Sequence, residues 1–393
     1  MSGAATSMAA TPFQRWDIFC AVVDNYGDAG VAWRLARQLA AEHDLAVRLF
    51  VDALPVLARL APGVDAALDA QRVENVEVRT WDGPQASSPI ADPAAVVIEA
   101  FGCGLPAAYL AAMAARARPP VWINLEYLSA EKWIEDCQGL ASRHPTLPLT
   151  RYFFFPGFTP ASGGLLRERD LVSRRNRFRA DAARESLWRK LGLEPPPDPE
   201  TLAVSLFCYP NAALPDLLDT WAEGDERVLC VVPEGVASAA LDRWTGGAVP
   251  HAGERLVRGR LALADVPFLS QDDYDRLLWA CDVNFVRGED SFVRAQWAAR
   301  PLVWHVYPQA EEAHRLKLDA FLDRYCAALP PDAGSALSAF ARAWNGDGDV
   351  APAWARLLDT RRALAVHAGA WAAELAVQPD LAATLVKFCL DRV

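Results

Sequence analysis

The segment that most constrains the fold covers residues 16–34, WDIFCAVVDNYGDAGVAWR. An apolar run leads into a tight glycine loop and then into an amphipathic helix. This order is typical of the first strand–loop–helix unit of a nucleotide-type α/β domain. Here, however, Asp24 and Asp28 flank Gly27 of the loop. A loop that cradles pyrophosphate presents backbone N–H groups, whereas two carboxylates repel an anion in a partly dry site. We therefore expect this loop to act on a cationic or protic group.

A structural role for the same carboxylates stays open. Asp28 is well placed to cap the following helix, and Asp24 to lie in a solvated turn. The position of both residues after the first strand favours catalysis over this alternative, because ligands of open α/β sheets bind at the carboxyl ends of the strands.

The length, net charge and cysteine pattern of the chain exclude several classes of protein. A chain of 393 residues exceeds the size of a single growing core, so we expect two domains. The net charge of −11 argues against nucleic-acid and membrane partners. The eight cysteines form no CxxC pair and no zinc spacing with histidine, which predicts reduced thiols, a cytoplasmic location and no metal. The N-terminus lacks a signal-peptide pattern, and no run is long and apolar enough to span a membrane.

Strands and helices alternate in both halves, which predicts parallel sheets. The first half has expected strands at 17–23, 46–51, 95–99, 120–124 and 151–155, and expected helices at 30–42, 105–116 and 129–136. The second half has expected strands at 202–208, 227–233, 256–260, 282–286 and 301–304, and expected helices at 212–222, 236–244, 272–280, 292–298 and 311–324, followed by a mainly helical C-terminus.

The boundary between the halves is expected between about 165 and 195, with the proline run EPPPDPE at residues 194–200 separating it from the next strand. We assign residues 1–180 to an N-terminal domain and residues 181–393 to a C-terminal domain. The basic stretch from Arg167 to Arg179 is interpreted as a solvated linker, with a docking surface for an acidic protein as the alternative.

An anion site is expected in the second half, where the strand DVNFV is followed by RGEDSFVRAQWA. Ser291 suits a helix N-cap, the helix N-terminus offers free N–H groups, and Arg287 adds a permanent positive charge. Glu289 and Asp290 are better suited to sugar hydroxyls, to backbone groups or to orienting Arg287 than to a phosphate. An ordinary capped helix with a structural Arg–Asp pair remains the alternative.

Aromatic residues at predicted strand ends of the same half are candidates for stacking on a nucleobase. Phe207 and Tyr209 end the run SLFCY, and Phe268 and Gln271 lie in DVPFLSQDDYD. An aromatic face stacks on a base, and an amide reads its edge. Each aromatic taken alone is better explained by a place in the core, so the prediction of a base site rests on all of them lying at strand ends of the same half.

An anion site in one half and an acidic loop in the other suit the GT-B plan of glycosyltransferases, in which two Rossmann-like domains face each other across a cleft. The motifs WDIFCAVVDNYGDAGVAWRLARQL, SLFCYPN and FVRGEDSFVRAQWA, in this order, closely resemble the protein-arginine rhamnosyltransferases of bacterial elongation factor P, the EarP family. The resemblance extends over nearly the whole chain apart from its N-terminal residues.

The resemblance implies transfer of L-rhamnose from dTDP-β-L-rhamnose to an arginine of elongation factor P, with inversion. No metal or other cofactor is expected, since the sequence has no DxD metal motif in a suitable strand-end setting, and helix N-termini and Arg can neutralise the leaving diphosphate. The resemblance places thymidine diphosphate in the C-terminal domain and the essential aspartates at Asp24 and Asp28, with Asp28 as the general base. Glu289 would orient the sugar or stabilise its developing charge. By the same match, the donor-binding residues are Asn25, Gly27, Phe207, Tyr209, Phe268, Gln271, Arg287, Glu289, Asp290 and Ser291.

Two other functions remain open at this point. One is a GT-B enzyme that uses another nucleotide sugar or acceptor, or a sugar-nucleotide epimerase of similar architecture. The other is a non-catalytic module that binds a nucleotide sugar, which gives no reason for a pair of acidic residues in the first loop.

Overall fold

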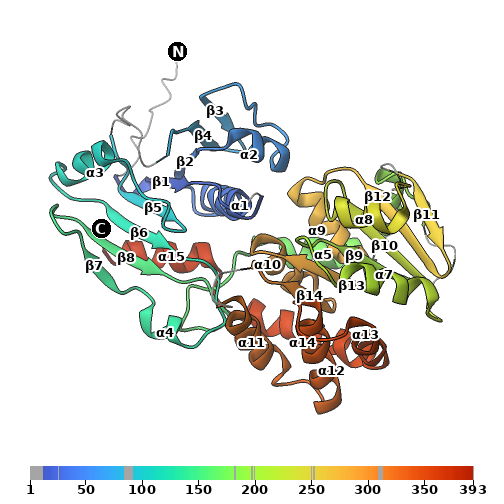
Figure 1. The fold of residues 1–393 in the computed structure, drawn as a ribbon. Coiled ribbons are helices and arrows are strands. Elements are labelled where there is room, and N and C mark those ends of the chain that lie inside the picture. Colours follow the sequence, from blue (N-terminus) through green and yellow to red (C-terminus); the bar gives the residue numbers. More distant parts are fainter. Residues whose placement is uncertain are drawn as a thin grey trace. The chain divides into compact units, whose positions relative to one another are not determined.

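The computed structural model describes residues 12–24, 26–83, 92–180, 183–195, 198, 200–248, 250, 253–308 and 313–392. The chain forms two compact units (Figure 1). Unit 1 takes its described residues from Met1–Leu128, Trp133–Leu166 and Pro379–Val393, and unit 2 from Ser129–Lys132 and Arg167–Gln378.

Unit 1 is built on an eight-stranded sheet in the order β3-β4-β2-β1-β5-β6-β8-β7. The inner strands are parallel, and the edge strands β3 and β7 are antiparallel to their neighbours. Its elements are β1 (Arg15–Cys20), α1 (Tyr26–Glu42), β2 (Ala46–Val51), α2 (Leu54–Leu60), β3 (Ala70–Val73), β4 (Val76–Thr80), β5 (Val96–Ala100), α3 (Ala107–Ala114), β6 (Val121–Leu125), α4 (Trp133–Cys137), β7 (Ala141–Arg143), β8 (Thr150–Phe154) and α15 (Leu381–Leu390), with a short 3-10 turn at Pro12–Gln14.

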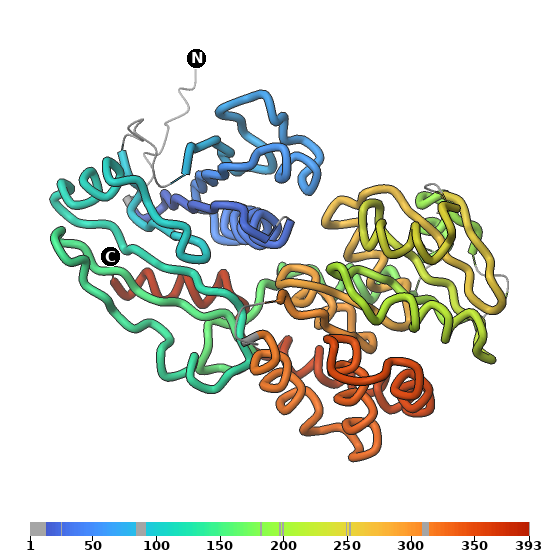
Figure 2. Tube along the Cα trace, in the orientation of Figure 1, coloured from blue at the N-terminus to red at the C-terminus, as the bar shows by residue number. Residues whose placement is uncertain are grey.

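The last helix, α15, belongs to unit 1, although the sequence placed the whole C-terminus with the second half. Figure 2 shows the chain returning in red to the strands of unit 1. The Phe388 ring lies 5.5 Å from the rings of both Tyr152 and Phe154 on β8, and Leu381 N–H donates to Leu165 O. The return cannot be read from the sequence, because the apolar face of α15 has the same pattern as a helix that packs locally. The unit boundary also lies earlier than residue 180, between Leu166 and Arg167.

Unit 2 contains a six-stranded sheet in the order β11-β12-β10-β9-β13-β14, parallel except for β11. Its elements are α5 (Leu171–Ala180), α6 (Ala183–Lys190), β9 (Leu202–Leu206), α7 (Leu214–Glu223), β10 (Val228–Pro233), α8 (Ser238–Thr245), β11 (Arg255–Arg258), β12 (Leu261–Val266), α9 (Gln271–Ala280), β13 (Val283–Arg287), α10 (Asp290–Ala298), β14 (Leu302–His305), α11 (Ala313–Cys326), α12 (Pro331–Trp344), α13 (Val350–Asp359) and α14 (Arg361–Val377).

Most expected strands and helices are confirmed within a few residues. One expected strand is the first arm of a hairpin whose second arm was not expected. The segment expected as a strand at 256–260 covers most of β11 and the turn that joins β11 to β12. Gly259 adopts a left-handed φ of 58° in that turn, a conformation that favours glycine. The strand that follows reads LALADV, and its alanines hide the strand signal because alanine is depleted in strands.

The basic stretch expected as a solvated linker is instead packed within unit 2. Arg175 donates to Trp297 O at 2.8 Å, and Arg179 donates to Ala298 O and to Ala299 O. These carbonyls end α10, where cationic side chains are favourable. Burial, with the charges of Arg300 and Arg175, lowers the pKa of Arg179 to about 10, so this arginine stays charged at neutral pH.

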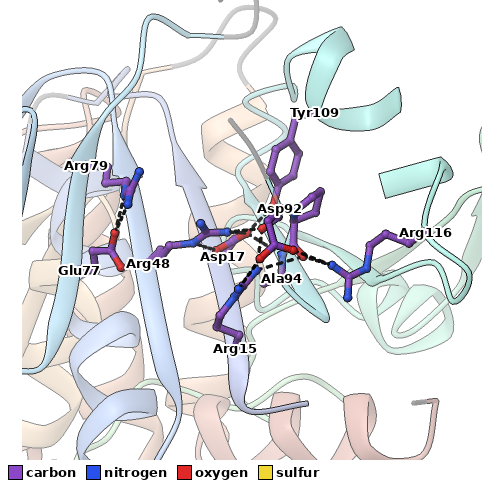
Figure 3. Close-up of polar contacts among 10 residues, drawn as sticks. Arg15, Asp17, Arg48, Glu77, Arg79, Asp92, Ala94, Tyr109 and Arg116 are labelled. Carbon is purple, nitrogen blue, oxygen red and sulfur yellow. Dashed lines mark hydrogen bonds and ion pairs between the residues drawn. The ribbon is translucent and has the colours of Figure 1, made fainter. Parts of the chain in front are cut away.

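A buried ion pair joins β1 to β2 in unit 1 (Figure 3). Both oxygens of Asp17 accept from Arg48, at 2.6 Å each. Asp17 Oδ2 also accepts from Ala94 N–H at 2.9 Å and from the Tyr109 hydroxyl at 2.5 Å. Burial and the charge of Asp17 raise the pKa of Tyr109 well above its usual value. The carboxylate thus ties β1 to β2, to the residues before β5 and to α3.

We predict that Asp17→Asn lowers the free energy of unfolding by about 3–5 kcal/mol, because it leaves the largely buried Arg48 cation without its partner. Chemical denaturation measures the change. Tyr109→Phe is the matched control: it removes only a neutral donor and is expected to cost about 1 kcal/mol. Equal, small losses for the two variants would contradict a structural role for the charge.

Candidate donor and acceptor sites

In unit 1, Asp28 lies inside the first turn of α1 and holds the loop that precedes it. Asp28 Oδ2 accepts from the N–H groups of Val23 and Asp24, both at 2.8 Å. Asp28 Oδ1 accepts from the Tyr127 hydroxyl at 3.2 Å. A carboxylate has about four acceptor positions, so three are occupied by groups of the described residues.

The helix begins earlier than expected, at Tyr26 rather than at residue 30. Asp28 therefore does not occupy the N-cap; it reaches back from the first turn to the loop. A Cβ at Gly27 would lie 2.9 Å from Asp24 Oδ2, so a larger residue here would displace the Asp24 carboxylate. The expected donor contact at Asn25 lies outside the described residues.

Tyr127, which the sequence analysis did not single out, is firmly held beside Asp28. Its ring stacks on Phe101, with centroids 4.4 Å apart and an interplanar angle of 17°. Phe101 has a left-handed φ of 58°, which is rare for a bulky residue and clusters at functional sites. Tyr127 follows β6, so its approach to the loop after β1 depends on the strand order and leaves no mark in the sequence.

In unit 2, three of the expected donor residues come together where neighbouring strands β9 and β13 end. The Arg287 guanidinium carbon lies 4.4 Å from the centre of the Phe207 ring and 4.8 Å from that of Tyr209. Arg287 Nη1 donates to Cys208 O at 3.0 Å. Among the described residues Arg287 forms no ion pair, which disfavours the structural Arg–Asp pair. The aromatic faces stabilise this cation without neutralising it.

Ser291 closes the turn between β13 and α10 and is not the N-cap that the sequence predicted. α10 begins at Asp290, and Glu289 is its N-cap. Ser291 Oγ accepts from Arg287 N–H at 3.0 Å and donates to Arg287 O. Gly288, between them, has a left-handed φ of 59°. This turn fixes the Arg287 backbone against the start of the helix.

The remaining expected donor residues of unit 2 follow strands at the same carboxyl edge of the sheet. Gln271 begins α9 and donates through Nε2 to Asp290 Oδ2 at 3.4 Å. Phe268 follows β12, and its N–H donates to Glu234 Oε2 at 3.3 Å. Phe268 lies in the loop that joins β12 to α9, and Tyr274 of α9 packs against Phe207.

His305, expected to be a satisfied structural histidine, is buried at the end of β14 with Nδ1 lacking a partner among the described residues. Its ring lies edge-on to Tyr209, 5.5 Å between centroids. Burial and the charges of Arg287 and His314 lower the pKa of His305 to about 4. It is therefore neutral at pH 7 and does not repel Arg287. Tyr274, also missed, packs its ring 5.5 Å from Phe207.

Within the described residues, the helices include none with the length and hydropathy to cross a membrane. The same part of the chain holds no group of three or more His, Cys, Asp or Glu side chains arranged to bind a metal ion.

Comparison with known proteins shows the family. The model of the family described as Elongation-Factor P (EF-P) rhamnosyltransferase EarP matches residues 16–390. Proteins named protein-arginine rhamnosyltransferase are 52% identical in Pseudomonas putida over 95% of this chain and 98% of the relative, and 51% identical in Pseudomonas aeruginosa over 96% and 99%. A relative of the same name in Neisseria meningitidis is 35% identical over 97% of this chain and 98% of its own length.

Solved structures agree with the sequence relatives. A structure described as the basis for EarP-mediated arginine glycosylation of translation elongation factor EF-P matches with a TM-score of 0.69 and 38% identity, covering 96% of this chain and 99% of the other. The spinosyn rhamnosyltransferase SpnG, at a TM-score of 0.50 and 12% identity over 96% and 100%, shows a shared fold. The chain therefore has the GT-B fold of glycosyltransferases and belongs to the EarP family of protein-arginine rhamnosyltransferases.

Proposed function

We propose that this protein transfers L-rhamnose from dTDP-β-L-rhamnose to an arginine side chain of elongation factor P, with inversion at the anomeric carbon. The observation that carries the proposal is Arg287, a cation held by two aromatic rings and a backbone carbonyl, without an ion pair to any described residue. The relatives' names and the EF-P structure support the acceptor. We place the reaction in the cytoplasm, where translation factors act.

Unit 2 is proposed to hold the donor. Arg287 and the N-terminus of α10 stabilise the diphosphate, because a fixed cation and free helix N–H groups both favour an anion. Phe207, Tyr209 and Phe268 provide faces for the base and ribose. Gln271, Asp290 and Ser291 complete the donor contacts. Glu289, at the N-cap of α10, is proposed to orient the sugar or to stabilise its developing positive charge.

Unit 1 is proposed to hold the acceptor arginine. A guanidinium carries five donors, and its pKa lies above about 12. It is therefore positively charged at neutral pH, and an acidic loop is a suitable partner for it. A carboxylate does not remove a proton from a free guanidinium at neutral pH. We infer instead that Asp28, with Asp24, binds and aligns one nitrogen and takes its proton only as the new bond forms.

In the reaction, an arginine nitrogen attacks the anomeric carbon from the face opposite the diphosphate. The new N–C bond forms as the bond from carbon to the diphosphate oxygen breaks, and thymidine diphosphate leaves with the electron pair. The proton of the attacking nitrogen passes to Asp28. A single displacement of this kind inverts the β-linked donor to an α-linked product. Arg287 and the helix N-terminus take the place of a metal in neutralising the leaving group.

The direct test is mass spectrometry of elongation factor P after incubation with this protein and dTDP-β-L-rhamnose. We expect one added deoxyhexose on one arginine, and no addition when that arginine is replaced by lysine. Transfer from another nucleotide sugar in preference to dTDP-rhamnose, or donor binding with no modified protein, would contradict the proposal and favour another GT-B enzyme or a binding module.

We predict that Asp28→Asn lowers turnover by about 10²–10⁴-fold and leaves the Kd for dTDP nearly unchanged. The amide oxygen still accepts from Val23 and Asp24 N–H, so the loop is kept, but an amide does not take a proton. Turnover assays and calorimetry measure the two quantities. Asp52→Asn is the matched control: Asp52 Oδ1 accepts from Val22 N–H at 2.9 Å in the same loop, and near-normal turnover is expected. A weakened Kd in Asp28→Asn would count against the assignment.

We predict the reverse pattern for Arg287→Ala. Losing a charge-assisted contact of about 1.5–3 kcal/mol raises the Kd for dTDP by roughly 10- to 150-fold. Isothermal titration measures it. Arg227→Ala is the matched control, since it removes one positive charge at the opposite end of the unit 2 sheet, where Arg227 pairs with Asp198. Equal affinities in both variants would show that Arg287 does not bind the donor.

A further inference from the structure

A buried ion pair links the two helices whose first residues belong to the proposed donor site. Arg294 on α10 is 1% exposed and Asp275 on α9 is 2% exposed. Arg294 Nε donates to Asp275 Oδ1 at 2.9 Å, and Arg294 Nη2 donates to Asp275 Oδ2 at 2.5 Å. The guanidinium also donates through Nη1 to Glu168 Oε2 at 2.8 Å. A bidentate pair of this kind fixes direction as well as distance.

The pair lies one helical turn below a donor-site contact. Asp275 follows Gln271 by four residues, and Arg294 follows Asp290 by four, so each couple shares one face of its helix. Gln271 Nε2 and Asp290 Oδ2 are 3.4 Å apart at the helix starts. The two contacts therefore form successive rungs between α9 and α10, and the lower rung determines how far apart the two N-termini lie.

Stability alone is a weak reason for such a pair. Desolvation of two ions often cancels their attraction, and apolar residues of similar volume hold helices together equally well. Burial alone lowers the pKa of Arg294, but the charges of Asp275 and Glu168 outweigh it and raise the pKa, so the cation persists. A bidentate ion pair also fixes the direction of contact between the helices, which apolar packing constrains less strictly.

The far end of α10 is held as well. Arg175 and Arg179 of α5 donate to the carbonyls of Trp297, Ala298 and Ala299. With its C-terminal end anchored and its middle tied to α9, α10 presents Asp290, Ser291 and the adjoining Arg287 in one position.

We propose that Arg294 and Asp275 are positioning residues for the donor: their ion pair sets the spacing of the α9 and α10 N-termini at which the nucleotide diphosphate binds. The inference rests on the proposed function, because it assumes that these N-termini hold dTDP. Neither residue touches the reacting atoms. Their loss affects donor affinity and not the acceptor or the chemical step.

The experiment compares three variants of the full-length protein by titration with dTDP, by steady-state kinetics and by thermal unfolding. Asp275→Asn and Arg294→Lys each remove the bidentate contact between the two side chains. We expect the Kd for dTDP and the KM for dTDP-rhamnose to rise about tenfold in each. The kcat at saturating donor and the KM for the acceptor protein stay within about threefold. The double variant Asp275→Leu/Arg294→Met is expected to regain thermal stability but not donor affinity, since apolar packing restores burial without register.

Asp17→Asn serves as the control for destabilisation alone, because it disrupts a buried ion pair of unit 1. We expect a lower Tm with an unchanged Kd for dTDP. A wild-type Kd in the double variant, or in both single variants, would overturn the inference and leave the pair as a structural contact.

Arg287→Ala, run in parallel, separates the two proposals. Weak dTDP binding in Arg287→Ala beside normal binding in the Asp275 and Arg294 variants would refute the positioning role alone. Normal dTDP binding in Arg287→Ala would refute the proposed donor site itself.

Discussion

The account depends on a cation that the fold holds in place without neutralising. Arg287 lies at the end of β13 between two aromatic rings and a backbone carbonyl, and it forms no ion pair within the described part of the chain. Keeping a guanidinium in this state leaves its charge available to an anion. The turn closed by Ser291 fixes the backbone of Arg287. The neighbouring His305 is neutral at pH 7, so it does not repel the Arg287 cation.

The opposite electrostatic arrangement is found in the first loop of unit 1. Asp28 is buried, and among the described residues two backbone N–H groups and one hydroxyl donate to it. The expectation that Asp28 caps the helix is wrong, because α1 begins at Tyr26 and Asp28 lies inside its first turn. The carboxylate orders its own loop through Oδ2, and its Oδ1 accepts from the Tyr127 hydroxyl. The catalytic role that we propose for Asp28 is additional to this structural one.

Much of this could be predicted from local pattern. The apolar run before Gly27, the strand before Arg287 and the alternation of strands and helices are all visible in the sequence, and the structure confirms them. What the sequence does not contain is which strands are neighbours. Phe207 meets Arg287 because β9 pairs with β13.

Long-range contacts account for the other failures of the sequence analysis. The return of α15 to unit 1, the capping of α10 by the arginines of α5, and the contact of Tyr127 with Asp28 all join segments far apart in the chain. A basic run such as RRNRFR has the same composition whether it is solvated or caps a distant helix, so periodicity alone does not distinguish the two.

The most direct test of this division of charge is a crystal structure with thymidine diphosphate bound. The account predicts that the diphosphate lies against the Arg287 guanidinium and the first N–H groups of α10, with no density beside the loop from Asp24 to Asp28. A diphosphate bound at that acidic loop, with Arg287 left free of it, would contradict the account.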